Sequence, residues 1–255
     1  GLIQLHVDVL TPSNSSLIPP PSSLMNVAII AAAGEGKRFG AKRAKQFLEL
    51  AGAPVIVHTL RRFEECAEVH EVIVVLPAVD AARFVGLAGK YGLRKVARVV
   101  AGGATRAESV LRGLQAIRSA TAQIVAIHDG VRPLVTAEEI TRTVRAAEES
   151  GAAVLVAPVV DTIKEVQDEK VIHTLERARL RRALTPQCFR YSLLRRAYEE
   201  AGASAAEATD ESALVERLGV VVTTVEGDPR NIKITRPEDI ALAEIILKQR
   251  PEVRG

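Results

Sequence analysis

The feature that most constrains the fold is a regular alternation of unbroken apolar runs with amphipathic segments. Five runs are rich in Val and Ile and lack polar alternation, as is typical of strands buried on both faces. They lie at 26–31, 72–76, 96–100, 124–127 and 153–157. Helices are predicted between them, at about 54–65, 80–90, 106–119 and 137–150. Such alternation predicts an α/β fold with a doubly wound, mostly parallel sheet.

Helix-end signals support this assignment. Thr105 and Thr136 each precede a Glu by three residues, the spacing of a capping box, and Gly151 is suited to end the fourth helix. After residue 157 the rhythm changes. Two extended segments, 161–166 and 171–176, flank a polar tetrapeptide and predict a projecting β-hairpin arm. Helices near 190–201 and 210–218, a strand at 220–225, an extended piece at 231–234 and a last helix from Pro237 complete the prediction.

Residues 1–24 differ from the rest, being rich in Ser and Pro and lacking Lys and Arg. We interpret them as an extension that is disordered or non-native, and residues 25–250 as a single domain. No apolar run approaches the roughly 18 residues that span a bilayer. The two cysteines, Cys66 and Cys188, lack metal-ligand spacing, so we expect reduced, part-buried thiols and a cytoplasmic protein.

The composition argues against nucleic-acid binding. The formal charge is only +3, no basic run alternates with aromatic residues, and the chain has no Trp. A mild excess of Arg and Lys also suits a polyanionic small molecule. We therefore expect neither a nucleic-acid nor a membrane partner.

A small-residue loop, 31–40, directly follows the first predicted strand, where open α/β sheets bind their ligands. Its glycines let the backbone approach a polyphosphate, and Lys37, Arg38 and Lys45 add charge nearby. The dinucleotide fingerprint fails because Phe39 occupies the position of its third glycine. The ATPase P-loop fails because no Gly-Lys-Ser/Thr triplet occurs. The loop therefore indicates a nucleoside triphosphate.

Three other segments carry candidate site residues. Asp129 ends the fourth predicted strand and is a candidate Mg²⁺ ligand, although Asp-Gly is also a common turn. His128 is more simply a structural residue. The Gly102-Gly103 turn leads to a helix that contains Ser109, and Lys233 lies on the extended piece near the end. By themselves these segments leave structural roles open.

Together the segments resemble 2-C-methyl-D-erythritol 4-phosphate cytidylyltransferases, which have a Rossmann-like nucleotidyltransferase fold. The resemblance covers about residues 26–247 and rests on eight motifs in the family's order. These are Ala32-Ala-Gly34-x-Gly-x-Arg38, Lys45-Gln46, Gly102-Gly103-x-x-Arg106-x-x-Ser109-Val110, His128-Asp129-x-x-Arg132-Pro133, Asp161-Thr162-x-Lys164, Leu184-Thr-Pro-Gln187, Thr209-Asp210-Glu-x-Ala213 and Asn231-Ile-Lys233-Ile-Thr-Arg-Pro-Glu-Asp239.

The resemblance implies transfer of CMP from CTP to a sugar-alcohol phosphate, with Mg²⁺ or another divalent cation held by Asp129. It implies catalytic roles for Arg38, Lys45 and Lys233. It implies CTP contacts from Ala32, Ala33, Gly34, Gly103, Ser109 and Asp129. It implies acceptor contacts from Arg177, Thr162 and Arg132.

The resemblance further implies a homodimer whose arms, at about 161–176, exchange between subunits. Three alternatives remain at this stage. A ribitol 5-phosphate cytidylyltransferase shares most motifs, an NAD(P)-dependent oxidoreductase shares the fold class, and a non-catalytic nucleotide sensor would share the pocket. Retention of the full charge set argues against the sensor.

Overall fold

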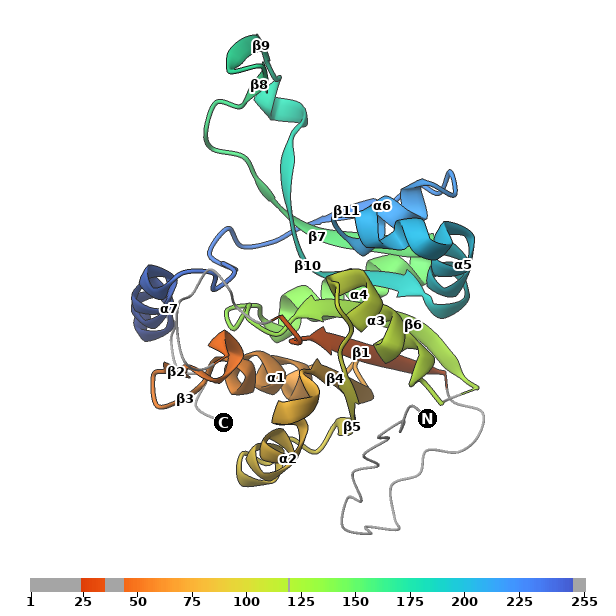
Figure 1. Ribbon diagram of the computed structural model, residues 1–255, viewed down its shortest axis with the longest axis vertical. Coiled ribbons are helices and arrows are strands. Elements are labelled where there is room, and N and C mark those ends of the chain that lie inside the picture. Colours follow the sequence, from red (N-terminus) through yellow and green to blue (C-terminus); the bar gives the residue numbers. More distant parts are fainter. Residues whose placement is uncertain (1–23, 35–43, 119, 250–255) are drawn as a thin grey trace.

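A seven-stranded sheet forms the centre of the computed structural model, which describes residues 24–34, 44–118 and 120–249 (Figure 1). The strand order is β11-β7-β10-β6-β1-β4-β5. Their bounds are β1 Met25–Ala31, β4 Glu71–Leu76, β5 Val96–Ala101, β6 Ala122–Asp129, β7 Ala152–Pro158, β10 Arg181–Arg190 and β11 Thr223–Glu226. Every neighbouring pair is parallel except those of β10, which runs antiparallel to β6 and β7. The α/β class and the mostly parallel sheet are confirmed.

Helices cover both faces of this sheet. One face packs against α1 (Val55–Glu65), α2 (Ala81–Lys90) and α4 (Ala137–Ser150). The other packs against α3 (Arg106–Gln115), α5 (Tyr191–Ala201) and α6 (Glu211–Glu216). Successive residues of β1 point to opposite faces, so Ala28 and Ile30 join the first core whereas Val27 and Ile29 join the second. This double coverage explains why the strands are apolar throughout.

A smaller core lies beside the sheet and fixes the segment after β11. It joins the short hairpin of β2 (Glu49–Leu50) and β3 (Ala53–Pro54) to α7 (Pro237–Gln249). Ile234 is fully buried there, and its backbone N–H donates to the Val131 carbonyl at 2.9 Å. The extended piece predicted at 231–234 is therefore present, but it pairs through this contact and is not a strand of the sheet.

Strand β10 was not predicted, and Pro186 explains why. A proline inside an apolar run argues against a central strand because it cannot donate to the ladder. The register between β10 and β7 shifts between Ala183 and Gln187, so Pro186 occupies the interruption. The Thr185–Pro186 peptide bond is cis.

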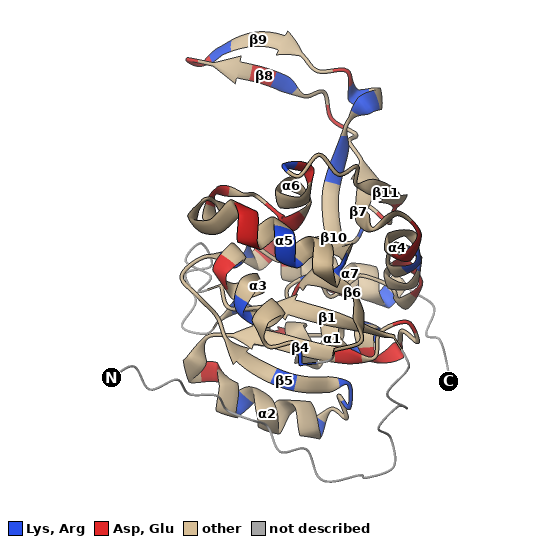
Figure 2. Ribbon diagram, turned by 90° about the vertical axis from the view of Figure 1, so that its right-hand side faces the viewer, with Lys and Arg blue, Asp and Glu red and all other residues tan. Residues whose placement is uncertain are grey.

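The predicted hairpin arm is confirmed. It consists of β8 (Lys164–Gln167) and β9 (Lys170–Thr174), which project from the rest of the protein (Figure 1). Asp168 and Glu169 connect the strands with φ of 48° and 62°, the left-handed pair of a tight hairpin turn. Every residue of both strands is exposed. Figure 2 shows basic residues where the arm joins the body, on Arg177–Arg179 and the start of β10.

Several element boundaries differ from prediction. Helix α3 ends at Gln115, and β11 begins at Thr223. Thr136 forms a complete capping box, whereas Thr105 caps α3 with its side chain only, because Glu108 instead accepts from the Ala104 N–H. Gly151 ends α4 with φ of 91° as expected. Both cysteines are free and buried. The interpretation of residues 1–24 lies outside the described residues, apart from Leu24.

Among the described residues, the longest helices fall short of what a bilayer crossing requires in length and apolarity.

Candidate active site

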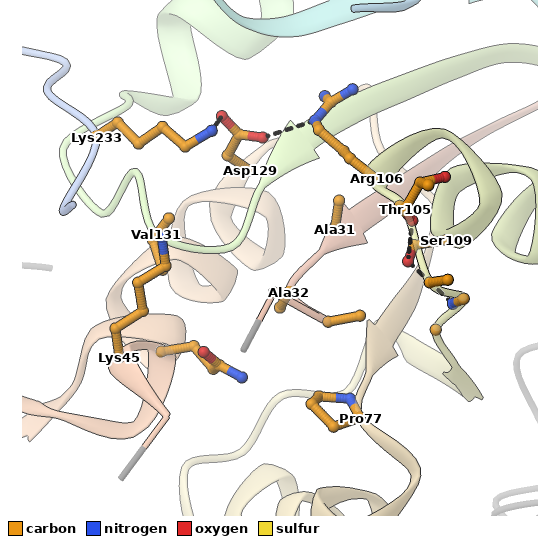
Figure 3. Close-up of a pocket in the computed structure, with 16 residues that line it drawn as sticks. Ala31, Ala32, Lys45, Pro77, Thr105, Arg106, Ser109, Asp129, Val131 and Lys233 are labelled. Atoms are coloured by element: carbon orange, nitrogen blue, oxygen red, sulfur yellow. Dashed lines mark hydrogen bonds and ion pairs between the residues drawn. The ribbon is translucent and has the colours of Figure 1, made fainter. Parts of the chain in front are cut away.

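A cavity of about 690 Å³ opens at the carboxyl ends of four parallel strands (Figure 3). The strand order changes direction here, since the chain runs outward from β1 to β4 and β5 and then returns to place β6 on the other side of β1. Ligands of open α/β sheets bind at such switch points. The residues that line the cavity are Ala31, Ala32, Ala33, Gly34, Lys45, Gln46, Pro77, Gly102, Gly103, Ala104, Thr105, Arg106, Ser109, Asp129, Val131 and Lys233.

Small residues allow the loops after β1, β5 and β6 to approach one another closely. A Cβ on Gly102 would overlap that of Ala33, and one on Gly130 would come within 2.6 Å of the Ala32 Cβ. Any side chain at either glycine would push the loops apart. Ala32, Ala33, Gly34 and the Gly102 turn therefore form a narrow wall of small residues, which allows a ligand in the cavity to approach the backbone closely.

The amino-terminal end of α3 forms another part of the wall. The Ser109 hydroxyl accepts from the Gly103 N–H at 3.1 Å and donates to the Thr105 carbonyl at 2.9 Å. Ser109 is thus buried and shapes the turn, although it also lines the cavity. The first turn of a helix favours anions, because its N–H groups lack partners within the helix.

Asp129, the last residue of β6, is the focus of charge in the cavity. Its Oδ1 accepts from Arg106 Nε at 3.2 Å, and its Oδ2 accepts from Arg132 Nε at 3.2 Å and pairs with Lys233 Nζ at 3.0 Å. Figure 3 shows Arg106 and Lys233 approaching the carboxylate from opposite sides. Burial by itself raises the pKa of Asp129, but the three cations outweigh burial and hold that pKa well below its usual range.

Arg132 and Lys233 reach Asp129 from neighbouring loops. Arg132 Nη1 also donates to the Asn231 carbonyl at 2.9 Å, which ties the loop after β6 to the segment that carries Lys233. Arg132 is 13% exposed at its side chain and does not line the cavity, whereas Lys233 is 37% exposed and does. Arg132, a predicted acceptor-binding residue, thus lies beside the cavity and contacts its Asp129 carboxylate.

Lys45 lies on a short 3-10 helix, Lys45–Phe47, on the opposite side of the cavity from Arg106 (Figure 3). Phe47 is buried beneath it in the core that contains α1, which fixes the helix in place. The predicted catalytic residue Arg38 lies outside the described residues, so its position is not part of the described cavity.

Two predicted acceptor-binding residues lie on the arm. Thr162 and Arg177 are exposed, and neither lines the cavity. Arg177 Nη1 donates to the Val160 carbonyl at 2.6 Å. This bond joins the segment that leads into the arm to the segment that follows it. The structure thus brings together eight predicted site residues and separates these two from them. The eight are Ala32, Ala33, Gly34, Lys45, Gly103, Ser109, Asp129 and Lys233.

Sequence reasoning did not assign roles to Arg106, Glu211 or Thr185, which contact the site or its residues. Arg106 Nη1 donates to both carboxylate oxygens of Glu211, at 2.7 and 2.8 Å. The Thr185 hydroxyl accepts from the Asp129 N–H at 3.3 Å and bonds to His128 Nδ1 at 2.9 Å. All three lie within the family motifs named above. The signal that the sequence offered was a polar residue in an apolar run, for Thr185, or a charged residue at the start of a helix, for Arg106 and Glu211.

The donor set can be compared with the needs of a divalent cation. Among the described residues, no group of three or more His, Cys, Asp or Glu side chains could hold a metal. Asp129 offers one carboxylate at the cavity, and Mg²⁺ commonly uses one or two carboxylates with phosphate oxygens and water. The residues present therefore fit Mg²⁺ bound jointly with a polyphosphate, and they do not form a complete protein cage.

Comparison with known proteins gives a consistent result. The sequence profile of the 2-C-methyl-D-erythritol 4-phosphate cytidylyltransferase family matches residues 26–249. The chain is 42% identical over 226 residues to the enzyme of that name from Alkaliphilus metalliredigens, covering 88% of this chain and 93% of the relative. It is 45% identical over 222 residues to that of Symbiobacterium thermophilum, covering 87% and 92%.

Solved structures agree with the sequence comparisons. The crystal structure of 4-diphosphocytidyl-2C-methyl-D-erythritol synthase from Anaerococcus prevotii superposes with a TM-score of 0.79 at 31% identity, covering 89% of this chain and 97% of that one. The 2-C-methyl-D-erythritol 4-phosphate cytidylyltransferase of Thermus thermophilus superposes with a TM-score of 0.69 at 36% identity, covering 89% and 100%.

Proposed function

The chain belongs to the 2-C-methyl-D-erythritol 4-phosphate cytidylyltransferase family, and from that premise we propose that it transfers CMP from CTP to 2-C-methyl-D-erythritol 4-phosphate and releases pyrophosphate. It is a nucleotidyltransferase, which replaces the oxidoreductase and sensor alternatives.

One observation carries the proposal. The small-residue wall, two lysines from separate segments and the Asp129 carboxylate all line a single cavity at the switch point of the sheet. A triphosphate needs close backbone approach and positive charge, and this cavity supplies both.

The reaction we propose is an in-line displacement. A phosphate oxygen of the acceptor attacks the α-phosphorus of CTP, a new P–O bond forms, and the bond to the pyrophosphate oxygen breaks. The acceptor phosphate is already anionic near neutral pH, so no general base is required. The protein then acts by positioning the two substrates and by stabilising the charge that develops on the α-phosphoryl oxygens.

Each described residue has a part in this proposal. Lys45 and Lys233 stabilise charge on the phosphates from two sides of the cavity. Arg38, which lies outside the described residues, is proposed to share this role. The backbone at Ala32, Ala33, Gly34 and Gly103 contacts the nucleotide, and Ser109 holds the turn in shape. Asp129 would hold a divalent cation with oxygens of the bound triphosphate, and such an ion supplies Lewis-acid stabilisation when bound.

We also propose that a second subunit completes the site. Thr162 and Arg177 lie outside the cavity of their own subunit, on or beside an exposed arm. A lone two-stranded hairpin is only marginally stable in water, and this one exposes Val166, Val171 and Ile172. A homodimer in which each arm packs on the partner would cover these side chains and bring Arg177 to the partner's acceptor site.

The activity itself provides the test. Purified protein incubated with CTP, MgCl₂ and 2-C-methyl-D-erythritol 4-phosphate is expected to release pyrophosphate and to form one cytidine-diphosphate-linked product, identified by mass spectrometry. Absence of both under conditions where the protein is folded would contradict the proposal.

A further inference from the structure

Glu211 is a buried carboxylate that the proposed reaction does not use. It is the first residue of α6, is 1% exposed, and does not line the cavity. Its two oxygens bind Arg106 Nη1, and the Tyr198 hydroxyl donates to Oε1 at 3.2 Å. Burying a carboxylate costs desolvation free energy, which a neighbouring cation or hydrogen-bond donors must offset.

Arg106 connects this buried carboxylate to the cavity. The same guanidinium donates through Nη1 to Glu211 and through Nε to Asp129 Oδ1. Burial lowers the pKa of Arg106, but the two carboxylates outweigh burial and raise it above its ordinary value. Arg106 is therefore a permanent cation shared between an acid outside the cavity and an acid inside it.

The distances show which partner holds Arg106 more closely. The contacts with Glu211 are 2.7 and 2.8 Å, whereas the contact with Asp129 is 3.2 Å. Charge-assisted hydrogen bonds are strongest at the shorter distances. If Asp129 engages another cation, Arg106 keeps an anionic partner, so releasing Asp129 leaves no buried charge unpaired.

We propose that Glu211 is a positioning residue that holds Arg106 at the cavity wall and thereby keeps Asp129 available to the divalent cation that accompanies CTP. The inference rests on the proposed function, because it assumes that Asp129 binds that cation. Without Glu211, Arg106 has Asp129 as its remaining acidic partner in this network, so it competes with the cation for the carboxylate.

The charges of this cluster predict how the affinity for CTP changes when Glu211 is replaced. Arg106, Arg132 and Lys233 carry three positive charges, against which stand Asp129 and Glu211. Replacing Glu211 by Gln removes a negative charge near the triphosphate site. Binding of metal-free CTP should therefore be unchanged or tighter, while the magnesium dependence of binding becomes weaker. Simple damage to the fold would weaken both.

The test is calorimetric titration of CTP into the full-length protein without acceptor, in EDTA and over a series of MgCl₂ concentrations. For Glu211→Gln, the MgCl₂ concentration that gives half of the full effect on CTP affinity is expected to rise about tenfold, as for residues that orient metal ligands. In EDTA, the Kd for CTP should not rise. Glu211→Asp, which keeps the charge but has a shorter reach, should shift the magnesium requirement in the same direction by less.

Two controls separate positioning from folding. Glu139→Gln alters a carboxylate that is equally buried, at 3% exposure, but caps α4 and binds the Asp228 N–H away from the cavity. It should lower Tm and leave the magnesium dependence unchanged. In an Arg106→Gln background, Glu211→Gln should cause no further shift in the magnesium requirement, because the guanidinium that Glu211 positions is absent.

The inference is overturned if Glu211→Gln has the wild-type magnesium dependence, if its Kd rises equally in EDTA and in MgCl₂, or if Glu139→Gln produces the same shift. If Glu211→Gln does not fold, a wild-type magnesium dependence in Glu211→Asp overturns it. Failure of the wild-type protein to bind CTP at all would instead count against the proposed function.

Discussion

Lys233 and Asp129 form an ion pair 3.0 Å long across the cavity mouth, although they lie on segments far apart in the sequence. The pair exists because Ile234 is buried in the small core beside α7 and its N–H bonds the Val131 carbonyl. The segment before α7 is thereby fixed against the loop after β6. The position of Lys233 at the cavity is thus set by apolar packing next to it in the sequence.

Lys233→Met is expected to lower kcat by about 100-fold, the usual scale for losing one preorganised group that stabilises transition-state charge. Because the Lys233 side chain is 37% exposed, Tm should change little. Steady-state kinetics and thermal melting check this. Lys248→Met, on the exposed face of α7, is the matched control and should keep full activity. Equal losses of activity in the two variants would contradict the assignment.

Asp129→Asn should lower stability as well as activity. The change leaves Arg106, Arg132 and Lys233 around a neutral amide, and removing one member of a buried ionic cluster typically costs about 3 kcal/mol or more. Urea unfolding measures the loss. In calorimetry, the variant should bind CTP with no dependence on MgCl₂. A magnesium dependence equal to that of the wild type would show that Asp129 is not a ligand.

Complementation between two inactive variants tests the exchanged arm. Lys45→Ala disables the cavity of its own subunit, whereas Arg177→Ala disables the partner's site. After equal mixing and subunit exchange, half of the dimers are hybrids, each with one intact site, so about a quarter of wild-type activity should return. Mixing Lys45→Ala with Lys233→Met, which both lie in the cavity, is the control and should restore no activity, because each hybrid dimer then carries one disabling substitution in each of its two cavities. If the mixture of Lys45→Ala with Arg177→Ala recovers no activity, Arg177 acts in its own subunit.

Recovery restricted to the mixture that contains Arg177→Ala identifies the arm as the element contributed by the partner.

Buried His128 makes stability depend on pH. Burial lowers its pKa to about 4, with Asp129 and hydrogen bonds to Arg132 and Thr185 only partly offsetting that effect. The unfolded chain binds a proton near pH 6.5, so the stability due to neutral His128 is present above that pH and is lost as pH falls towards 4. Between pH 7 and pH 5 the loss should be about 2 kcal/mol.

Urea unfolding in EDTA at both pH values measures this loss, and His128→Asn should remove most of it. His58, whose pKa is also lowered mainly by burial, contributes to the remaining dependence in both proteins. The same pH dependence in wild type and variant would contradict the assignment of the effect to His128.

The sequence predicted the parts of the fold that depend on local patterns. Unbroken Val and Ile runs located β1, β4, β5, β6 and β7, because strands buried on both faces leave no polar alternation. It missed β10 because Pro186 interrupts the run and because the strand begins with exposed Arg181 and Arg182. The antiparallel insertion of β10 between β6 and β7 depends on tertiary pairing, which no short window of sequence records.

The candidate site was also predictable only in part. Glycine spacing and strand ends indicated the wall and Asp129, and the motifs indicated Lys45 and Lys233. The pairing of Arg106 with Glu211 was not predictable, since it joins the starts of α3 and α6 on one face of the sheet. The separation of Arg177 from the cavity likewise follows from the arm's projection, which only the three-dimensional structure displays (Figure 1).

The identity of the acceptor is the central claim, and the ratio of two kcat/KM values tests it most directly. Pyrophosphate release is measured with CTP and MgCl₂ at varied 2-C-methyl-D-erythritol 4-phosphate, and again at varied ribitol 5-phosphate. Each 1.4 kcal/mol of preferential transition-state binding gives about a tenfold ratio, and we expect at least about 100-fold in favour of methylerythritol phosphate. A ratio that favours ribitol 5-phosphate would contradict the account.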